Sequence, residues 1–227
     1  MLTAHGFILI DKPIGITSHD VIDQLRRLTG IKKIGHAGTL DPLATGLLIV
    51  AVGREATRDI EQLAKMNKTY EAVFSLGQET DTYDAEGQIT KTYDGSIISE
   101  GQVAEALTFF VGQQQQVPPM YSAKKVNGQK LYELARQNKT IERQPSTITI
   151  SNLEMLNYHW PELSVRINCS SGTYIRSLAF DFGRAMGCGA HMSALRRIAI
   201  GDYDITKAVK LDSLTADNWT HYLWQLP

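Results

Sequence analysis

The sequence predicts a mixed α+β protein, and three observations predict it. Segments with strand periodicity alternate with segments of helical periodicity along the 227 residues, but their spacing is irregular. Regular βαβ spacing, which would favour a doubly wound parallel sheet, is missing. A chain of this length can bury a substantial core, and no internal repeat is visible. We therefore expect one elaborated domain built on a mixed α+β sheet.

The first third of the chain predicts short buried strands separated by amphipathic helices. Thr17 or Ser18 can cap the first helix, and Gly30 can end it, because glycine readily adopts the left-handed conformation at a helix C-terminus. In chain order we expect a strand at 7–10, this helix, a strand at 47–52, a helix over 54–65 and a strand at 68–76. Residues 77–87 are polar and predict a turn-rich loop.

The remaining elements follow from the same patterns. Ser99 followed by Gln102 predicts a capping box at the start of a helix that reaches about residue 110. In chain order we expect a strand at 88–92, that helix, strands at 147–156 and 163–169, a helix over 175–186 and a strand at 195–200. The tail from Asp204 contains two tryptophans and is expected to pack as a terminal helix on the body.

Residues 112–146 have a different composition from their surroundings. They begin with a polar run at 113–116, continue through Pro118-Pro119, and end in a basic stretch with helical periodicity. We interpret this segment as an arm that leaves the sheet and is stiffened by proline at its base.

The net charge of −1 is not typical of a protein that binds nucleic acid over its whole surface, so its distribution matters more. Two basic clusters lie at residues 26–33 and 122–143, while acidic residues gather at 79–86. A basic face could hold phosphates while an acidic face keeps the protein in solution. Each run taken singly also fits a solvated helix face.

Composition also limits the classes of protein. No apolar run approaches the ~20 residues that cross a bilayer, and the N-terminus lacks the features of a signal peptide. Cys169 and Cys188 do not have the spacing of a metal site. They are expected to be small buried residues in a reducing cytoplasm.

One segment, residues 35–46, carries the strongest chemical signal. It places the carboxylate of Asp41 in a glycine-rich turn, directly before the apolar run at 47–52. A charge beside a hydrophobic core is costly, which favours a functional site. By itself, however, Asp41-Pro42 fits a helix N-cap equally well.

The motifs, in their order along the chain, resemble those of the TruB family of tRNA pseudouridine synthases. Besides residues 35–46, the matching segments are DKPIGITS at 11–18, LGQETDTYDAEG at 76–87, PPMYSA at 118–123, CSSGTYIR at 169–176 and the stretch at 187–197 that ends in LRR. The resemblance extends from about residue 7 to residue 203. It implies the pseudouridine synthase fold, a curved, mixed and mostly antiparallel sheet with flanking helices and a central cleft.

The resemblance also implies a reaction, the isomerisation of uridine to pseudouridine in tRNA, at position 55 of the T loop. This reaction needs no redox step, and we expect no cofactor and no metal. Asp41 would be the nucleophile, and a bidentate pair with Arg176 would keep it charged and oriented. From the residues alone, Arg176 would be a surface ion-pair residue.

Further substrate-binding residues are assigned by the same resemblance. Tyr70 would stack on the base, and His36 would help to extrude the uridine from its loop. Tyr174 and Leu195 correspond to other positions of the pocket. Without the resemblance, the three apolar or aromatic residues would be read as core and His36 as an ordinary turn residue.

The arm would grip RNA and become ordered when RNA binds. Its expected RNA contacts, together with a lysine of the first motif, are Lys12, Tyr121, Lys124, Lys125 and Lys130. The catalytic domain would span residues 1–205. Residues 206–227 would form a C-terminal tail, too short for the RNA-binding PUA domain that bacterial members of the family carry.

The expected partner is therefore the T-stem loop of tRNA, bound by a cytoplasmic monomer with no membrane association. Two alternatives remain. The protein could perform the same chemistry on another RNA, or it could be a non-catalytic protein that binds or folds RNA.

Overall fold

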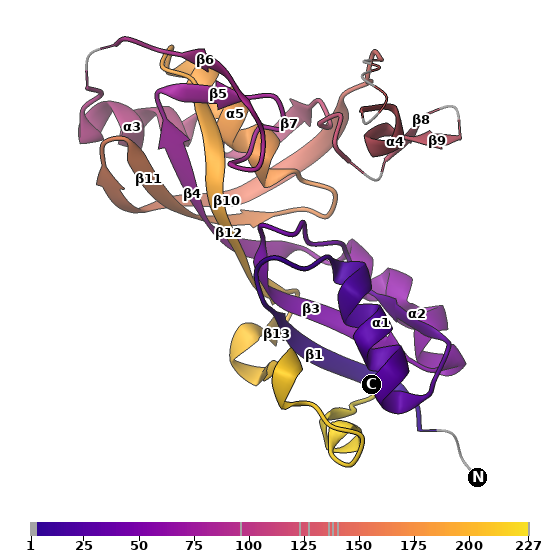
Figure 1. The fold of residues 1–227 in the computed structure, drawn as a ribbon. Helices are drawn as coiled ribbons and strands as arrows, with labels where there is room; N and C mark the ends of the chain where they lie inside the picture. Colours follow the sequence, from indigo (N-terminus) through magenta and orange to yellow (C-terminus); the bar gives the residue numbers. More distant parts are fainter. Residues whose placement is uncertain are drawn as a thin grey trace. The chain divides into compact units, whose positions relative to one another are not determined.

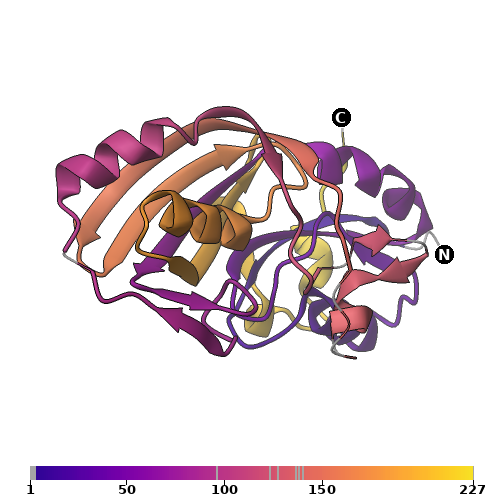
Figure 2. The same cartoon turned by 90° about the horizontal axis from the view of Figure 1, so that it is seen from above.

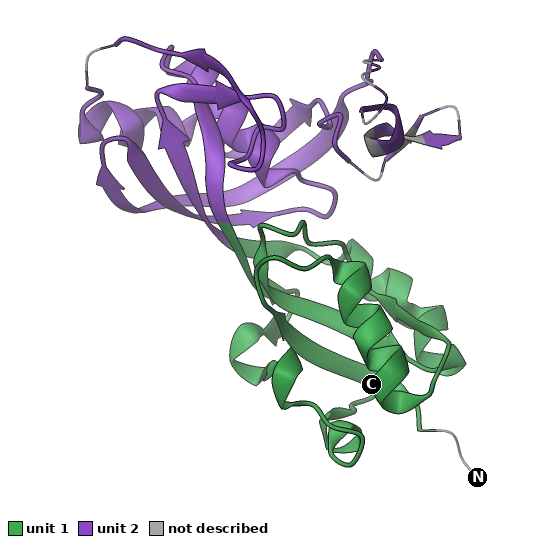
Figure 3. Cartoon of the chain, in the orientation of Figure 1, with its two compact units in different colours: residues 1–70, 195–227 green, residues 71–194 purple. Residues whose placement is uncertain are grey.

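The computed structural model describes residues 4–95, 97–122, 124–126, 128–135, 137, 139 and 141–226. The chain forms two compact units, one of residues 1–70 and 195–227 and the other of residues 71–194 (Figure 3). Strands β4 (Lys68–Leu76) and β12 (Ala190–Ile200) each run from one unit into the other. The proposed division into a catalytic domain and a tail at residue 205 stays a prediction.

The sheet of the first unit has the strand order β14-β1-β3-β12 (Figure 1). Strand β1 (Gly6–Lys12) is antiparallel to β3 (Thr45–Val52), and β3 is parallel to β12. Shorter strands extend it: β2 (Ile34–His36) pairs with β3, β13 (Tyr203–Asp204) with β12, and β14 (Val209–Lys210) with β1. The predicted buried strands at 7–10 and 47–52 are confirmed.

Two helices cover opposite faces of this sheet. Helix α1 (Ser18–Thr29) packs on the face that carries Ile8, Ile10 and the even-numbered apolar residues of β3. Helix α2 (Arg54–Lys65) packs on the other face, against Phe7, Leu9 and the odd-numbered residues. Because both faces are covered, β1 and β3 are continuous apolar runs without polar alternation.

The helix boundaries confirm the predictions from capping residues. Thr17 caps α1 and forms a capping box with Asp20, and Gly30 ends the helix with φ of 70°. Thr17 therefore fills the N-cap role, which leaves the neighbouring Ser18 hydroxyl available for another partner. Helix α3 (Glu100–Thr108) begins with the predicted box of Ser99 and Gln102.

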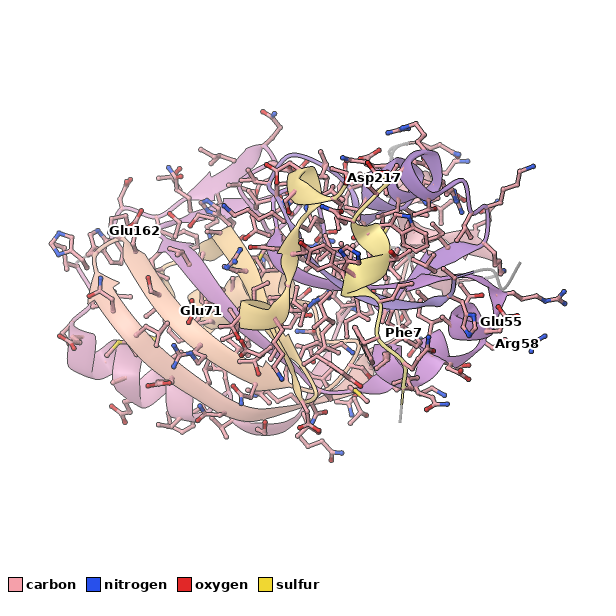
Figure 4. The ribbon with its side chains drawn as sticks, turned by 90° about the horizontal axis from the view of Figure 1, so that it is seen from below. Phe7, Glu55, Arg58, Glu71, Glu162 and Asp217 are labelled. Atoms are coloured by element: carbon pink, nitrogen blue, oxygen red, sulfur yellow. The ribbon has the colours of Figure 1, made fainter. Side chains whose placement is uncertain are left out.

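The terminal helix predicted from Asp204 is wrong. This segment instead forms three short 3-10 turns, which lie at Ile205–Lys207, Leu211–Ser213 and Trp219–Tyr222. Its apolar side chains pack on both faces of the sheet. Trp219 lies on the face that α1 covers, whereas Trp224 lies on the face that α2 covers. The rings of Phe7 and Trp224 lie 5.0 Å apart where the tail pairs with β1 at an antiparallel bridge (Phe7 is labelled in Figure 4). A single straight helix could not reach both faces.

The second unit contains the strand order β12-β4-β11-β10-β7, where β10 is Ser146–His159 and β11 is Glu162–Cys169. Every second residue of β4 and β11 is buried, as the alternating patterns predicted. Helices α3 and α5 (Ile175–Ala185) lie over this sheet (Figure 2). Phe182 of α5 joins the layers, since its ring is 6.2 Å from Phe74 of β4 and 5.6 Å from Phe110.

Two segments that were not predicted as strands form strands. Residues 112–116, expected at the start of the arm, form the edge strand β7 (Gly112–Gln116), which pairs with β10. Residues 78–80, expected in a loop, form β5 (Gln78–Thr80), which pairs with β6 (Ile89–Thr92). Both strands are polar because each lies at an edge or in a two-stranded ribbon, where little apolar surface is buried.

The arm therefore begins after Gln116. Its described part contains a hairpin of β8 (Lys125–Val126) and β9 (Gln129–Lys130), followed by the short helix α4 (Leu131–Ala135). Among the described residues, no helix combines the length and the apolar character needed to cross a bilayer. Cys169 and Cys188 are buried free thiols, as predicted.

Candidate functional site

Asp41 occupies the first position of a tight turn. Its carbonyl accepts a hydrogen bond from Ala44 N–H (3.0 Å), Pro42 takes the second position, and β3 begins at Thr45. Aspartate and proline are favoured at these two positions of a β-turn. Because no helix starts here, the N-cap interpretation of Asp41 is wrong. The residue is half-buried.

The DKPIGITS segment holds this turn from one side. The Ser18 hydroxyl accepts from Leu40 N–H (2.8 Å) and donates to Leu40 C=O (3.0 Å), so that one buried side chain fixes both backbone groups of the residue before Asp41. Gly15 N–H donates to the carbonyl of Pro42 at 2.9 Å. These bonds come from a segment more than twenty residues away in the chain.

Lys12 shapes that segment. Its side chain is completely buried, and its ammonium group donates to the carbonyls of Pro13 (2.9 Å) and Ile16 (2.7 Å). These bonds curl residues 13–16 toward the Asp41 turn. A contact of Lys12 with RNA stays a prediction, and it would require this buried side chain to be exposed.

The LRR segment holds the turn from the other side. Arg197 is only 1% exposed and donates to the carbonyls of Leu47 (2.7 Å) and Gly38 (3.0 Å). At Gly46, with φ of 100°, a Cβ atom would lie 2.3 Å from the Arg197 carbonyl oxygen, so only glycine fits. The neighbouring Arg196 forms a bidentate pair with Asp11 at 2.8 and 3.1 Å. Three separate motifs thus meet around Asp41.

His36 lies at the end of β2, before the turn. Its Nδ1 atom is buried and has no hydrogen-bond partner among the described residues. Burial, and secondarily the nearby charges of Arg197 and His19, lower the pKa of its imidazole below the usual 6.5. The folded protein therefore holds His36 neutral at pH 7.

This lowered pKa predicts a loss of stability in acid. Below pH 6.5 the unfolded chain binds a proton at His36 that the folded protein does not, so the free energy of unfolding falls as pH decreases. The contribution approaches about 1.4 kcal/mol per pH unit for one proton. Chemical denaturation between neutral pH and mild acid should give a shallower decline for His36→Gln than for the wild type. Identical declines would contradict the prediction.

Tyr70 and Leu195 lie on strands that continue between the units. Tyr70 is 8% exposed on the inward face of β4, and Leu195 is half-buried on β12, where its carbonyl accepts from the Thr45 hydroxyl at 3.5 Å. Their roles in a uridine pocket stay predictions.

Arg176 lies in the first turn of α5 and is 6% exposed. Its guanidinium contacts Asp84 Oδ2 at 3.4 Å and donates to the carbonyl of Tyr121 at 2.7 Å. Asp84, itself 3% exposed, also accepts from the Thr82 hydroxyl (2.6 Å) and from Glu86 N–H (3.1 Å). The structure thus buries Arg176 in an ion pair. The pair predicted between Arg176 and Asp41 joins residues of different units and stays a prediction.

The acidic face predicted at residues 79–86 needs correction. Glu79 and Asp84 are buried, at 4% and 3% exposure, and each pairs with an arginine of α5. Glu79 accepts from Tyr93 (2.7 Å) and Arg184 (3.3 Å). Although burial opposes the effect, these bonds keep the pKa of Glu79 below its usual value. The two carboxylates therefore organise the unit, whereas Asp81 and Glu86 remain at the surface.

Tyr174 immediately precedes α5, and its backbone is held by Gln116 of β7.

Sequence reasoning missed Gln116, Asp84, Ser18 and Arg197 as contributors to the site. Gln116 was hidden in a polar run, whereas the other three lie in recognised motifs whose roles only contacts could reveal.

The basic residues of the arm have mixed roles. The Lys124 ammonium group donates to the Ser146 hydroxyl, and Arg143 donates to the Pro118 carbonyl at 3.1 Å, so both brace the base of the arm. The side chains of Lys125 and Lys130 lie outside the described part of the structure. The described residues contain no group of three His, Cys, Asp or Glu side chains that could hold a metal.

Comparison with known proteins gives two consecutive family matches. Residues 26–175 match the model of the TruB family pseudouridylate synthase N-terminal domain, and residues 176–225 match that of the tRNA pseudouridylate synthase B C-terminal domain. The chain belongs to the TruB family.

Relatives and solved structures agree with this assignment. The chain is 52% identical to tRNA pseudouridine synthase B of Dechloromonas aromatica, over 92% of its own length and 69% of the relative. It is 47% identical to the protein of that name from Clostridium novyi, over 96% and 75%. A structure of a Cbf5-Nop10-Gar1 complex aligns with a TM-score of 0.73 and 29% identity, over 96% of this chain and 55% of that one.

Membership of the TruB family confirms the fold and the enzyme class that the sequence predicted. The mixed sheet with flanking helices is that of the pseudouridine synthases, and the class is that of intramolecular isomerases. The aligned structure is nearly twice as long, since this chain spans little more than half of it.

Proposed function

We propose that this protein converts uridine to pseudouridine at position 55, in the T loop of tRNA, with Asp41 as the nucleophile. The observation that carries the proposal is the construction around Asp41. Hydrogen bonds from the side chains of Ser18 and Arg197 and from Gly15 N–H hold backbone groups on both sides of a half-buried carboxylate. Such bracing is what a group that must meet a substrate atom in a fixed geometry requires.

The chemistry assigns a step to the carboxylate. The bond between N1 of the base and C1′ of the ribose breaks, the base turns, and C5 joins C1′ while its proton leaves. Asp41 would form a covalent bond either with C1′ or with C6 of the base, and would be released when C5 and C1′ join. No electrons are gained or lost overall, so neither an oxidant nor a reductant is required.

The other residues would hold the substrate. In the proposed assignment Tyr70 stacks on the extruded base, His36 supports the vacated loop, and Tyr174 and Leu195 line the pocket. Arg176 would keep the Asp41 carboxylate charged. The RNA contacts would come from the arm, at Tyr121, Lys124, Lys125 and Lys130.

The partner proposed for this chain is the T-stem loop of tRNA, bound by a monomer in the cytoplasm. Relatives that share about half of its residues are named tRNA pseudouridine synthase B. The two buried free thiols fit a reducing compartment.

Release of tritium from uridine labelled at C5 tests this function. A T-stem-loop transcript should release one tritium for each pseudouridine formed, and a transcript with cytidine at position 55 should release none. Equal release from both transcripts would contradict the choice of position 55. Binding of the transcript without any tritium release would favour a non-catalytic protein that binds or folds RNA. Release only from RNAs other than tRNA would favour the same chemistry on another RNA.

A further inference from the structure

Gln116 makes an unusual contact for a residue of a polar edge strand. It is the last residue of β7 and is 4% exposed. Its side-chain oxygen accepts from the backbone N–H of Tyr174 at 2.8 Å, and its side-chain N–H donates to the backbone carbonyl of the same residue at 3.0 Å. A single amide thus pairs with both backbone groups of Tyr174, as a neighbouring strand would.

This contact holds the residue at which helix α5 begins. Tyr174 is the N-cap of α5, with extended φ and ψ of −96° and 108°, and no side-chain cap bond is made at this end of the helix. The Tyr174 carbonyl also accepts the first helical bond, from Leu178 N–H at 3.1 Å. Gln116 therefore fixes the direction in which the helix leaves Tyr174, from a position 58 residues earlier in the chain.

The segment that follows Gln116 continues along the same helical turn. The Ser177 hydroxyl donates to the carbonyl of Val117 at 3.3 Å, and Arg176 donates to the carbonyl of Tyr121 at 2.7 Å. Residues 116–121 thus bind the start of α5 at three points, namely Tyr174, Arg176 and Ser177. Of these three points, Tyr174 is the one held by two hydrogen bonds, both from the Gln116 side chain.

We propose that Gln116 is a positioning residue that sets the first turn of α5, and with it Tyr174 and Arg176, for the isomerisation. The inference rests on the proposed function, since it concerns the geometry of residues assigned to that site. Gln116 acts through the backbone of Tyr174. Its loss shifts the start of the helix, and a shift of about 1 Å in a reacting group costs roughly 10²-fold in rate.

Gln116→Met tests this with a side chain of similar length that has no amide. We expect kcat for tritium release to fall about 10²-fold, with KM within roughly threefold because the lost contact acts on the reacting geometry. The matched control is Gln115→Met in the same strand. The Gln115 side chain is exposed, and its only hydrogen bond within the described part of the structure is to the Thr147 hydroxyl, at 2.9 Å, so this variant should keep wild-type kcat. Equal kcat values for the two variants would overturn the proposal.

Gln116→Glu gives a second readout, which a purely structural role would not produce. An ionised carboxylate can accept from Tyr174 N–H but repels the Tyr174 carbonyl, whereas the protonated acid can make both bonds. Burial raises the pKa of such a carboxyl group. The kcat of Gln116→Glu relative to wild type should therefore rise as pH falls, while the ratio for Gln116→Met stays constant. A constant ratio for Gln116→Glu would overturn the proposal.

The two sets of outcomes separate this inference from the proposed function. A wild type that releases no tritium refutes the function. An active wild type with an equally active Gln116→Met refutes only the positioning role. Thermal unfolding identifies a variant that fails to fold, and if Gln116→Met is such a variant, the pH dependence of Gln116→Glu decides.

Discussion

Replacement of Asp41 by asparagine is expected to lower tritium release from a T-stem-loop transcript by at least about 10³-fold, because an amide cannot act as the nucleophile. The fold should survive. The turn bond at this position uses the backbone carbonyl of Asp41, and asparagine is well suited to the first position of a β-turn. The measurement is single-turnover release of tritium with enzyme in excess.

Binding and a matched variant make this result specific. The dissociation constant of the transcript should change by less than about tenfold, since one carboxylate contributes little to a contact dominated by phosphates. Asp59→Asn, on the exposed face of α2, removes the same charge elsewhere and should keep full activity. If Asp41→Asn retained wild-type release, Asp41 would not be the nucleophile.

The second large effect is expected at Arg197, and it concerns stability. Arg197→Met would leave the carbonyls of Gly38 and Leu47 without their buried donor. An unsatisfied buried polar group costs about 1–3 kcal/mol, so the free energy of unfolding should fall by roughly 2–5 kcal/mol. Thermal unfolding should show a Tm lower by about 5–15 °C.

Arg58 provides the control for that experiment. It lies on α2 and its side chain points to solvent (Figure 4), so Arg58→Met should change the free energy of unfolding by less than about 0.5 kcal/mol. A similar Tm for both variants would show that the contacts of Arg197 contribute little. Because Arg197 braces the Asp41 turn, its replacement should also lower activity at temperatures where the variant remains folded.

The elements that the sequence predicted well are those with a local physical cause. Apolar alternation located β4 at residues 68–76, and the capping residues located α1 and α3. Predictions failed where a segment is stabilised by distant partners. The polar residues of β7 form a strand because β10 offers them an edge, and the tail forms short turns because its two tryptophans pack on opposite faces of one sheet.

The same distinction, between local causes and distant partners, applies to the residues of the candidate site. The residue types at Asp41, Tyr70 and Arg176, in the order of the motifs, were sufficient to predict the family and the reaction. No sequence pattern indicated that Asp84 is buried beside Arg176, that Ser18 holds Leu40, or that Gln116 holds Tyr174. Each of these contacts joins residues that are far apart in the chain.

The order of motifs along the chain was enough to determine the family, the enzyme class and the type of fold, because these depend on residue identity and on short-range periodicity. Only the tertiary structure decided which polar residues are buried and what they bond. The physical reason is that a buried polar side chain must find a hydrogen-bond partner, and that partner is chosen by the packing of distant segments.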